Sequence, residues 1–165
     1  MRRQDPHIAP LWPHLKPPTF PRPPVRHSAE VQRRPMSWTV LSYDQEPSCL
    51  LHLNGWLQQL PPDASGEQLG AACIQALAHS RDGASEEDRL IGWQLLGYRD
   101  NSAYLTLAKA VSLSMLPGYD SVKITALVRQ RRGLEVISPL RQLTGPAGKP
   151  AGLGAAVERA FRELV

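Results

Sequence analysis

Hydrophobic residues recur at helical spacing in two segments of the chain that resemble each other. Residues 69–76 read Leu-Gly-Ala-Ala-Cys-Ile-Gln-Ala and residues 153–160 read Leu-Gly-Ala-Ala-Val-Glu-Arg-Ala, so five of eight positions are identical at an offset of 84 residues. Both segments place apolar side chains at i, i+4, i+7 and i+8, which predicts two amphipathic helices. The small residues after each leading leucine would let either helix approach a sheet or another backbone closely. The competing interpretation is chance, because alanine-rich amphipathic helices are common.

Strand patterns precede each of these helices. Residues 38–43, 110–115 and 122–128 alternate apolar and polar side chains or are rich in β-branched residues. Residues 134–137 follow a charged, glycine-containing loop, which is typical of a hairpin. Residues 48–60 are ambiguous, because their leucines also fit a helical stripe. The pattern predicts an α+β fold in which a curved antiparallel sheet carries two packed helices, with strands before a helix in each half.

Short polar motifs mark the ends of these elements. Ser65 is placed to cap the first helix, with Glu67 in the first turn, where a negative charge suits the helix dipole. Asp82 and Gly83 then end that helix. Ser85 and Asp88 have the spacing of a capping box, although the residues after them look less helical than this signal implies.

Residues 1–35 differ in composition from the rest of the chain. They hold nine of the 16 prolines, and seven Lys or Arg residues against Asp5 and Glu30, whereas the remaining 130 residues hold 12 basic and 13 acidic side chains. Proline lacks a backbone donor and disfavours helix in its predecessor. We therefore predict that residues 1–35 form a disordered extension and that residues 36–165 form a single domain. Met1 and Met36 are both candidate start sites, and the change in composition favours Met36.

A search for catalytic and cofactor motifs finds none that is complete. Lys149 is followed by proline where a phosphate-binding loop needs Ser or Thr. His52 and His79, the histidines beyond residue 35, are not at metal-binding spacing, and Cys49 and Cys73 read as two reduced thiols. We therefore predict no catalytic residues, no metal and no cofactor. A histidine–carboxylate pair formed only in the tertiary structure stays open as the alternative.

Two charged clusters are candidate binding surfaces. The predicted partner-binding residues are acidic and would steer the docking of a basic protein: Asp82, Glu86, Glu87 and Asp88, with Asp44 and Glu46 from an earlier loop. The alternative is a solvated loop and helix start. Arg129, Arg131 and Arg132 form a basic turn, which is either solvated or able to contact phosphates.

Several short motifs resemble the immunity proteins of bacterial contact-dependent growth-inhibition systems. They are Leu69-Gly70, Ala76-Leu77, Ser80-Arg81, Trp93, Leu96-Gly97-Tyr98, residues 109–113, residues 136–139 and residues 153–157. The resemblance implies a small cytoplasmic protein without catalytic residues that binds and occludes the C-terminal domain of one cognate toxin, often a nuclease. It also implies, for some members, a Whirly-like fold in which a sheet-and-helix unit occurs twice. A single-stranded nucleic-acid-binding module of that architecture is the alternative function.

Overall fold

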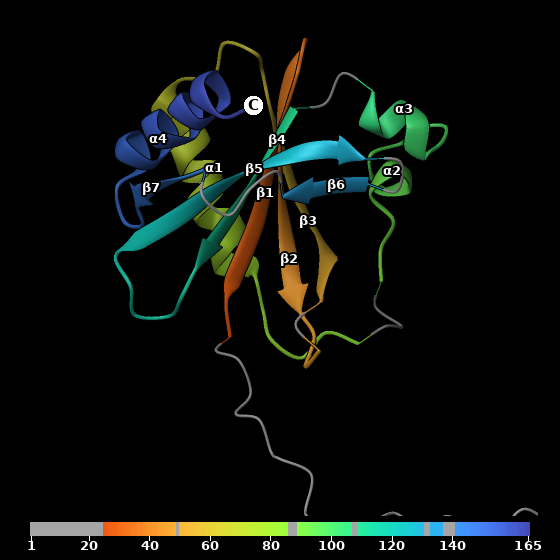
Figure 1. The fold of residues 1–165 in the computed structure, drawn as a ribbon, viewed down its shortest axis with the longest axis horizontal. Coiled ribbons are helices and arrows are strands. Elements are labelled where there is room, and N and C mark those ends of the chain that lie inside the picture. Colours follow the sequence, from red (N-terminus) through yellow and green to blue (C-terminus); the bar gives the residue numbers. More distant parts are fainter. Residues whose placement is uncertain (1–24, 49, 86–88, 107–108, 131–132, 137–140) are drawn as a thin grey trace, which may run out of the picture.

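An open antiparallel sheet forms the centre of the protein, and helices lie on both sides of it (Figure 1). The computed structural model describes residues 25–48, 50–85, 89–106, 109–130, 133–136 and 141–165. The strands run in the order β3-β2-β1-β4-β5-β6, and β7 pairs with β5 on the same edge as β6. The strands are β1 (His27–Arg34), β2 (Ser37–Gln45), β3 (Leu51–Leu60), β4 (Lys109–Met115), β5 (Ser121–Gln130), β6 (Gly133–Val136) and β7 (Gln142–Pro146).

Two long helices, α1 (Gly66–His79) and α4 (Pro150–Glu163), pack against each other and against one face of this sheet. The predicted α+β architecture is therefore confirmed. Two short helices, α2 (Gly92–Leu95) and α3 (Asn101–Leu105), follow α1 and precede β4 in the chain. In Figure 1 they lie on the other side of the sheet from α1 and α4. No helix among the described residues is long and apolar enough to cross a membrane.

The order of the elements repeats. Strands β1, β2 and β3 lead to α1, and strands β4, β5, β6 and β7 lead to α4. The two halves meet where β1 pairs with β4, and Val31 lies opposite Val111 in that register. A single core lies between the helices and the sheet, built from side chains of both halves, among them Val31, Val111 and Leu153.

The predicted start of α1 is confirmed by its cap. The Ser65 hydroxyl accepts a hydrogen bond from the Gln68 N–H at 3.2 Å, and the Gln68 side chain accepts one from the Ser65 N–H at 2.9 Å. This reciprocal pair satisfies two backbone donors that the helix itself leaves without partners. The capping box predicted at Ser85 and Asp88 stays a prediction, because residues 86–88 lie outside the described part of the chain.

The glycines of the repeated motif bring the two helix backbones into direct contact. A Cβ atom added at Gly70 would lie 1.8 Å from the carbonyl oxygen of Pro150, and one added at Gly154 would lie 1.7 Å from that of Gly66. Each helix therefore presents the fifth residue of its own sequence to the first residue of the other. The close approach predicted from the small residues occurs between the helices, with the same contact made in both directions.

Residues 48–60, which the sequence left ambiguous, form strand β3 from Leu51 onward. Their leucines pair with β2, and Leu57 lies opposite Leu41. Gly55 has a φ of +88°, a left-handed conformation that interrupts the regular strand and that a helix does not contain.

The prediction that residues 1–35 lie outside the domain is wrong for residues 27–34. These residues form β1, which pairs with β2 on one side and β4 on the other, and Ala29 and Val31 are buried in the core. The prolines of the segment end at Pro24, apart from Pro35 in the turn, so the composition of the whole segment hides a strand with alternating side chains. Met36 therefore follows the first strand of the sheet.

Removing β1 should abolish folding. A chain that starts at Met36 would lose two buried apolar side chains, worth about 1.5–3 kcal/mol for one the size of valine, and the hydrogen-bond partners of both β2 and β4. We expect no cooperative thermal unfolding transition for this chain by circular dichroism. The matched control starts at Val25 and keeps β1, and we expect it to unfold cooperatively. Equal melting temperatures for the two chains would contradict the central place of β1.

Adding a methyl group at the helix contact should destabilise the protein. Gly70→Ala and Gly154→Ala each force a Cβ into a backbone carbonyl, so we expect each to lower the free energy of unfolding by about 1–3 kcal/mol or more. Gly148→Ala is the control, because a Cβ at Gly148 meets no atom within 4 Å, and we expect a change within about 0.5 kcal/mol. Urea denaturation midpoints measure all three, and equal midpoints would show that the helices separate without cost.

Candidate functional site

Three of the predicted partner-binding residues lie together at one end of the β1–β2 hairpin. The Gln45 N–H donates to the Arg81 carbonyl oxygen at 2.9 Å, and the Gly83 N–H donates to the Gln45 carbonyl oxygen at 3.0 Å. These bonds hold the segment after α1 against the end of β2, with Gln45 and Asp82 as a bridged pair. We call the resulting group of Asp44, Glu46 and Asp82 the acidic edge. The other three predicted residues, Glu86, Glu87 and Asp88, lie outside the described residues.

Two carboxylates of the acidic edge also bind neighbouring segments of the chain. Asp44 Oδ1 accepts hydrogen bonds from Asn54 Nδ2 and from the Arg81 N–H, both at 2.8 Å. Glu46 contacts Nε2 of the buried His52 and accepts from the Ser48 hydroxyl at 2.6 Å. Hydrogen bonds therefore tie the carboxylates of Asp44 and Glu46 to neighbouring parts of the fold.

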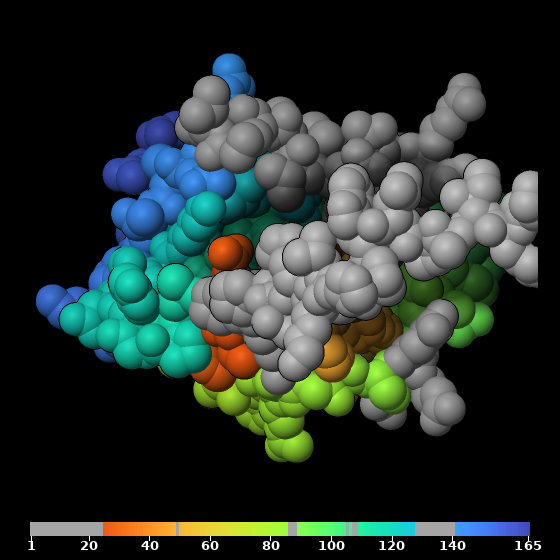
Figure 2. Space-filling model, turned by 60° about the horizontal axis from the view of Figure 1, so that its bottom comes forward, coloured from red at the N-terminus to blue at the C-terminus, as the bar shows by residue number. Residues whose placement is uncertain are grey.

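A cavity of about 210 Å³ adjoins the acidic edge and is lined by Asp44, Asn54, Trp56, His79 and Arg81. The His79 ring stacks on Trp56 at 5.2 Å, and its Nδ1 lies 2.8 Å from the Gln75 carbonyl oxygen. Both contacts hold the ring at the end of α1. Figure 2 shows the start of β1 (red) between residues near the end of α1 (yellow-green) and the β4–β5 segment (teal), and the Ser28 N–H donates to the Ser80 hydroxyl there at 2.9 Å.

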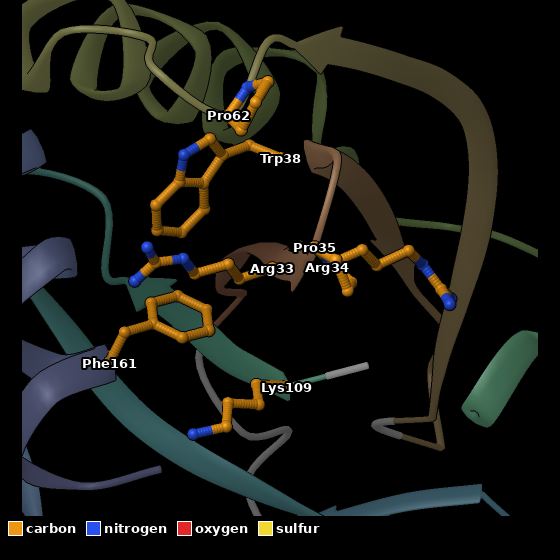
Figure 3. A pocket seen from close by; sticks show the side chains of 7 residues that line it. All are labelled: Arg33, Arg34, Pro35, Trp38, Pro62, Lys109 and Phe161. Carbon is orange, nitrogen blue, oxygen red and sulfur yellow. The ribbon is translucent and has the colours of Figure 1, made fainter. Parts of the chain in front are cut away.

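The opposite end of the β1–β2 hairpin holds a pocket that the sequence did not predict (Figure 3). The pocket has a volume of about 290 Å³, and we call it the cationic pocket. Its lining residues come from β1 and the turn after it, β2, the connection to α1, β4 and α4: Arg33, Arg34, Pro35, Trp38, Pro62, Lys109 and Phe161. Three of the seven are basic, and no acidic side chain is among them.

The strand register places the charges of the cationic pocket side by side. Arg33 lies opposite Lys109 across β1 and β4, and opposite Trp38 across β1 and β2. The Arg33 guanidinium lies 4.9 Å from the centre of the Trp38 ring, and Trp38 meets Phe161 edge to face at 5.1 Å. In Figure 3 the Arg33 side chain extends toward Trp38 and Phe161, whereas Arg34 points away from them.

A buried polar network occupies the sheet face opposite α1 and α4. Glu30 accepts hydrogen bonds from Gln32 Nε2 at 2.6 Å and from the Tyr43 hydroxyl at 2.9 Å. Gln32 also donates to the Tyr104 hydroxyl, which α3 brings to the sheet. Arg34 donates to the carbonyl oxygens of Tyr104 and Thr106, so it joins the end of β1 to the segment around α3.

Burial controls the titration of this network. Loss of solvent raises the pKa of Glu30 above its ordinary value, although the hydrogen bonds from Gln32 and Tyr43 and the charge of Arg34 oppose the change. Burial, together with the charge of Glu30, raises the pKa of Tyr43 well above its usual range and that of Tyr104 to about 12. Burial alone raises the pKa of Cys73 to about 12, so this thiol is an unreactive part of the core.

The remaining sequence candidates are less informative. Arg129 lies in β5 opposite Leu134, and Arg131 and Arg132 lie outside the described residues. Within the described ranges, no group of three His, Cys, Asp or Glu residues is arranged to hold a metal ion. A second basic cavity, of about 260 Å³, includes Arg26, Lys123 and Thr144 beside the turn between β4 and β5.

The functional candidates that the sequence missed lie mainly in β1. Glu30, Arg33 and Arg34 fall inside the segment that was predicted to be disordered. A signal for them exists, because Ser28, Glu30 and Gln32 alternate with Ala29 and Val31 shortly before a Pro-Met turn and a second strand. The alternation is short and is preceded by prolines, so composition outweighed it.

The fold is shared with two solved structures. A protein of unknown function from Neisseria meningitidis superposes with a TM-score of 0.67 at 19% identity, over 87% of this chain and 98% of that one. A chain of the CdiA-CT/CdiI toxin and immunity complex from Yersinia pseudotuberculosis superposes with a TM-score of 0.67 at 15% identity, over 83% of this chain and 96% of that one. No family model and no curated protein sequence matches the chain.

Replacing Glu30 should change how stability depends on pH. Because the pKa of Glu30 is raised in the folded state, the folded protein holds this proton more tightly than the unfolded chain does. The free energy of unfolding therefore falls as the pH rises from about 4.3, the pKa of an unburied glutamate, to the raised pKa of the folded state. Glu30→Gln keeps the size and an acceptor oxygen but does not titrate. We expect its melting temperature, relative to wild type, to rise between pH 4 and 8. Glu163→Gln, at an exposed position, is the control, and parallel Glu30→Gln and wild-type curves would contradict the prediction.

Proposed function

We propose that this chain is an immunity protein that binds a toxin domain of contact-dependent growth inhibition and neutralises it by occlusion. The observation that carries the proposal is the shared fold with a chain of a toxin and immunity complex, which extends over 83% of this chain and nearly the whole of the other. The motif resemblance in residues 69–157 points independently to the same class. The coarse role, a protein that binds a toxin, has more support than any particular toxin activity.

The acidic edge is the proposed contact surface. A toxin that acts on RNA or DNA must hold an anionic substrate, so its active face carries basic side chains. Carboxylates held in fixed positions opposite such a face would steer the encounter and lose little conformational freedom on binding. Asp44 and Glu46 have fixed positions through their hydrogen bonds, and Asp82 is held beside them. Glu86, Glu87 and Asp88, which begin four positions after Asp82 in the sequence, belong to the same predicted set of partner-binding residues.

The alternative, a single-stranded nucleic-acid-binding module, is supported by the basic cavity that includes Arg26 and Lys123. The two functions differ in what competes for binding. An immunity protein should capture one stoichiometric toxin domain and release it neither to salmon-sperm DNA nor to an oligonucleotide. A nucleic-acid binder should bind the oligonucleotide directly, with an affinity that falls steeply as salt increases.

The experiment uses the full chain and the toxin domain encoded beside its gene. Co-expression of the two should protect cells that the toxin domain alone arrests, and the two proteins should co-elute in size-exclusion chromatography. Protection without co-elution would contradict occlusion. Absence of both, with oligonucleotide binding present, would favour the alternative.

Reversing the acidic charge should slow association with the toxin. A Glu86→Lys, Glu87→Lys variant should fold normally but associate more slowly at low salt, by roughly tenfold or more, because charges at the rim of an interface act mainly on the association rate. The matched control is Asp63→Lys, Glu163→Lys, which makes the same change in net charge at two exposed positions elsewhere. Stopped-flow or surface plasmon resonance measures the rates. If both variants associate equally fast, the acidic residues are only a solvated surface.

A further inference from the structure

We propose that the cationic pocket binds a phosphate monoester group, such as the terminal phosphate of a nucleotide or of a polynucleotide. The site does not depend on the proposed immunity function, because it involves other residues at the other end of the β1–β2 hairpin. Arg33 and Lys109 supply its positive charges, and Trp38 and Phe161 form the aromatic part of its lining (Figure 3).

The first argument is the concentration of positive charge. Arg33 and Lys109 face each other directly on neighbouring strands, an arrangement that is unfavourable for two like charges. Both side chains are exposed, and no acidic side chain among the described residues lines the pocket. Glu163, the acidic residue in the last turn of α4, faces Arg159 at 3.9 Å. A bound anion would remove the repulsion between the two cations.

The second argument is that the arginine is already in position. Its guanidinium rests on the Trp38 ring, and the Trp38 ring is held edge to face by Phe161. Trp38 and Phe161 are 3% and 5% exposed, so they are fixed parts of the core and act as a support. An arginine held by aromatic rings loses less freedom on binding, and its planar group can donate two parallel hydrogen bonds to a phosphate.

The third argument selects a phosphate monoester over a carboxylate. Two cations in one pocket match a group that carries nearly two negative charges at neutral pH, whereas one cation is enough for a carboxylate. Lys109 donates to an oxygen of Val165, the last residue in the structure, at a long 3.4 Å, and an ammonium group has three donors, so two are left for a ligand. The volume of about 290 Å³ leaves space for more of the ligand beside the phosphate. Arg34 donates to the carbonyl oxygens of Thr106 and Tyr104. Its contribution to the pocket is therefore positive potential and not a hydrogen bond to the ligand.

The position of the pocket also favours an anion. β1 is eight residues long, and at about 3.3 Å per residue the cationic pocket and the acidic edge lie roughly 25 Å apart. Screening reduces interactions between exposed charges beyond about 8 Å at physiological ionic strength. The carboxylates of the acidic edge therefore do not repel a phosphate in the pocket.

Calorimetric titration of the full chain with adenosine 5′-monophosphate tests the site. We expect saturable binding that is absent with adenosine and weaker by at least tenfold with acetate. Arg33→Gln and Lys109→Gln should each raise the dissociation constant at least tenfold, because each removes a charged hydrogen-bond donor. Lys149→Gln, at an exposed lysine just before α4, is the control and should leave it unchanged. Arg33→Lys keeps the charge without the fork and should bind with intermediate affinity.

The pH dependence provides a separate readout. A phosphate monoester loses its second charge below a pKa of about 6. Affinity should therefore fall severalfold between pH 7.5 and 5. Thermal unfolding of each variant shows that it is folded before titration.

Two further ligands distinguish the sources of the phosphate. The first is a single-stranded oligonucleotide with a 5′-phosphate, and the second is the same oligonucleotide with a 5′-hydroxyl. If the 5′-phosphate form binds at least tenfold tighter than the 5′-hydroxyl form, the ligand is a polynucleotide end. If the 5′-phosphate form and the mononucleotide bind equally, the ligand is a free nucleotide, and either result supports the site. The proposal is overturned if adenosine monophosphate does not saturate, if acetate binds as well, or if all variants bind alike. Toxin protection by Arg33→Gln is expected to equal wild type, so failure of this site leaves the proposed function standing.

Discussion

The contact between the N-terminal parts of α1 and α4 sets the distance between the two helices, and the rest of the structure depends on that distance. At Gly70 and Gly154 the helices meet backbone to backbone, and the space for a side chain is taken by the carbonyl oxygens of Pro150 and Gly66. Each helix comes from one half of the chain, so this contact joins the halves on one face of the sheet. The pairing of β1 with β4 joins them within the sheet. Because both joints are close, one core serves both halves, with Leu69 and Leu153 buried in it.

In this arrangement, charged side chains lie at the two ends of the β1–β2 hairpin. The helices cover one face of β1 and β2, so the side chains that face them in mid-strand are mainly apolar, such as Val31 and Val40. Charged side chains gather where the hairpin begins and ends, the acidic edge at one end and the cationic pocket at the other. The β1–β2 hairpin therefore carries an acidic group at one end and a basic pocket at the other, and the two proposed interactions use separate residues.

The polar network on the second face shows how the segment around α3 is held. A buried carboxylate loses hydration, and such a group is stable only when other groups satisfy it. Glu30 accepts from Gln32 and Tyr43, and Gln32 reaches Tyr104 from α3. Arg34 adds bonds to two backbone carbonyls of that segment. The segment is thus fixed mainly by polar contacts with β1, whereas α1 and α4 are fixed by apolar packing.

The sequence by itself determined the two long helices, the cap at Ser65 and strands β4, β5 and β6, because these depend on local periodicity and on capping within a few residues. It also indicated that the helices would pack closely, because glycine and alanine leave no side chain to keep backbones apart. Only the tertiary structure decided that residues 27–34 are a central strand, because a short alternating run gains its stability from β2 and β4 rather than from its own composition. The same holds for the candidate sites. The approach of Arg33 to Lys109, which are 76 positions apart in the chain, follows from strand register, and the approach of Asp82 to Asp44 follows from how the chain turns after α1. Local sequence carries no record of either distance, because both arise from pairing between segments that meet only in the folded state.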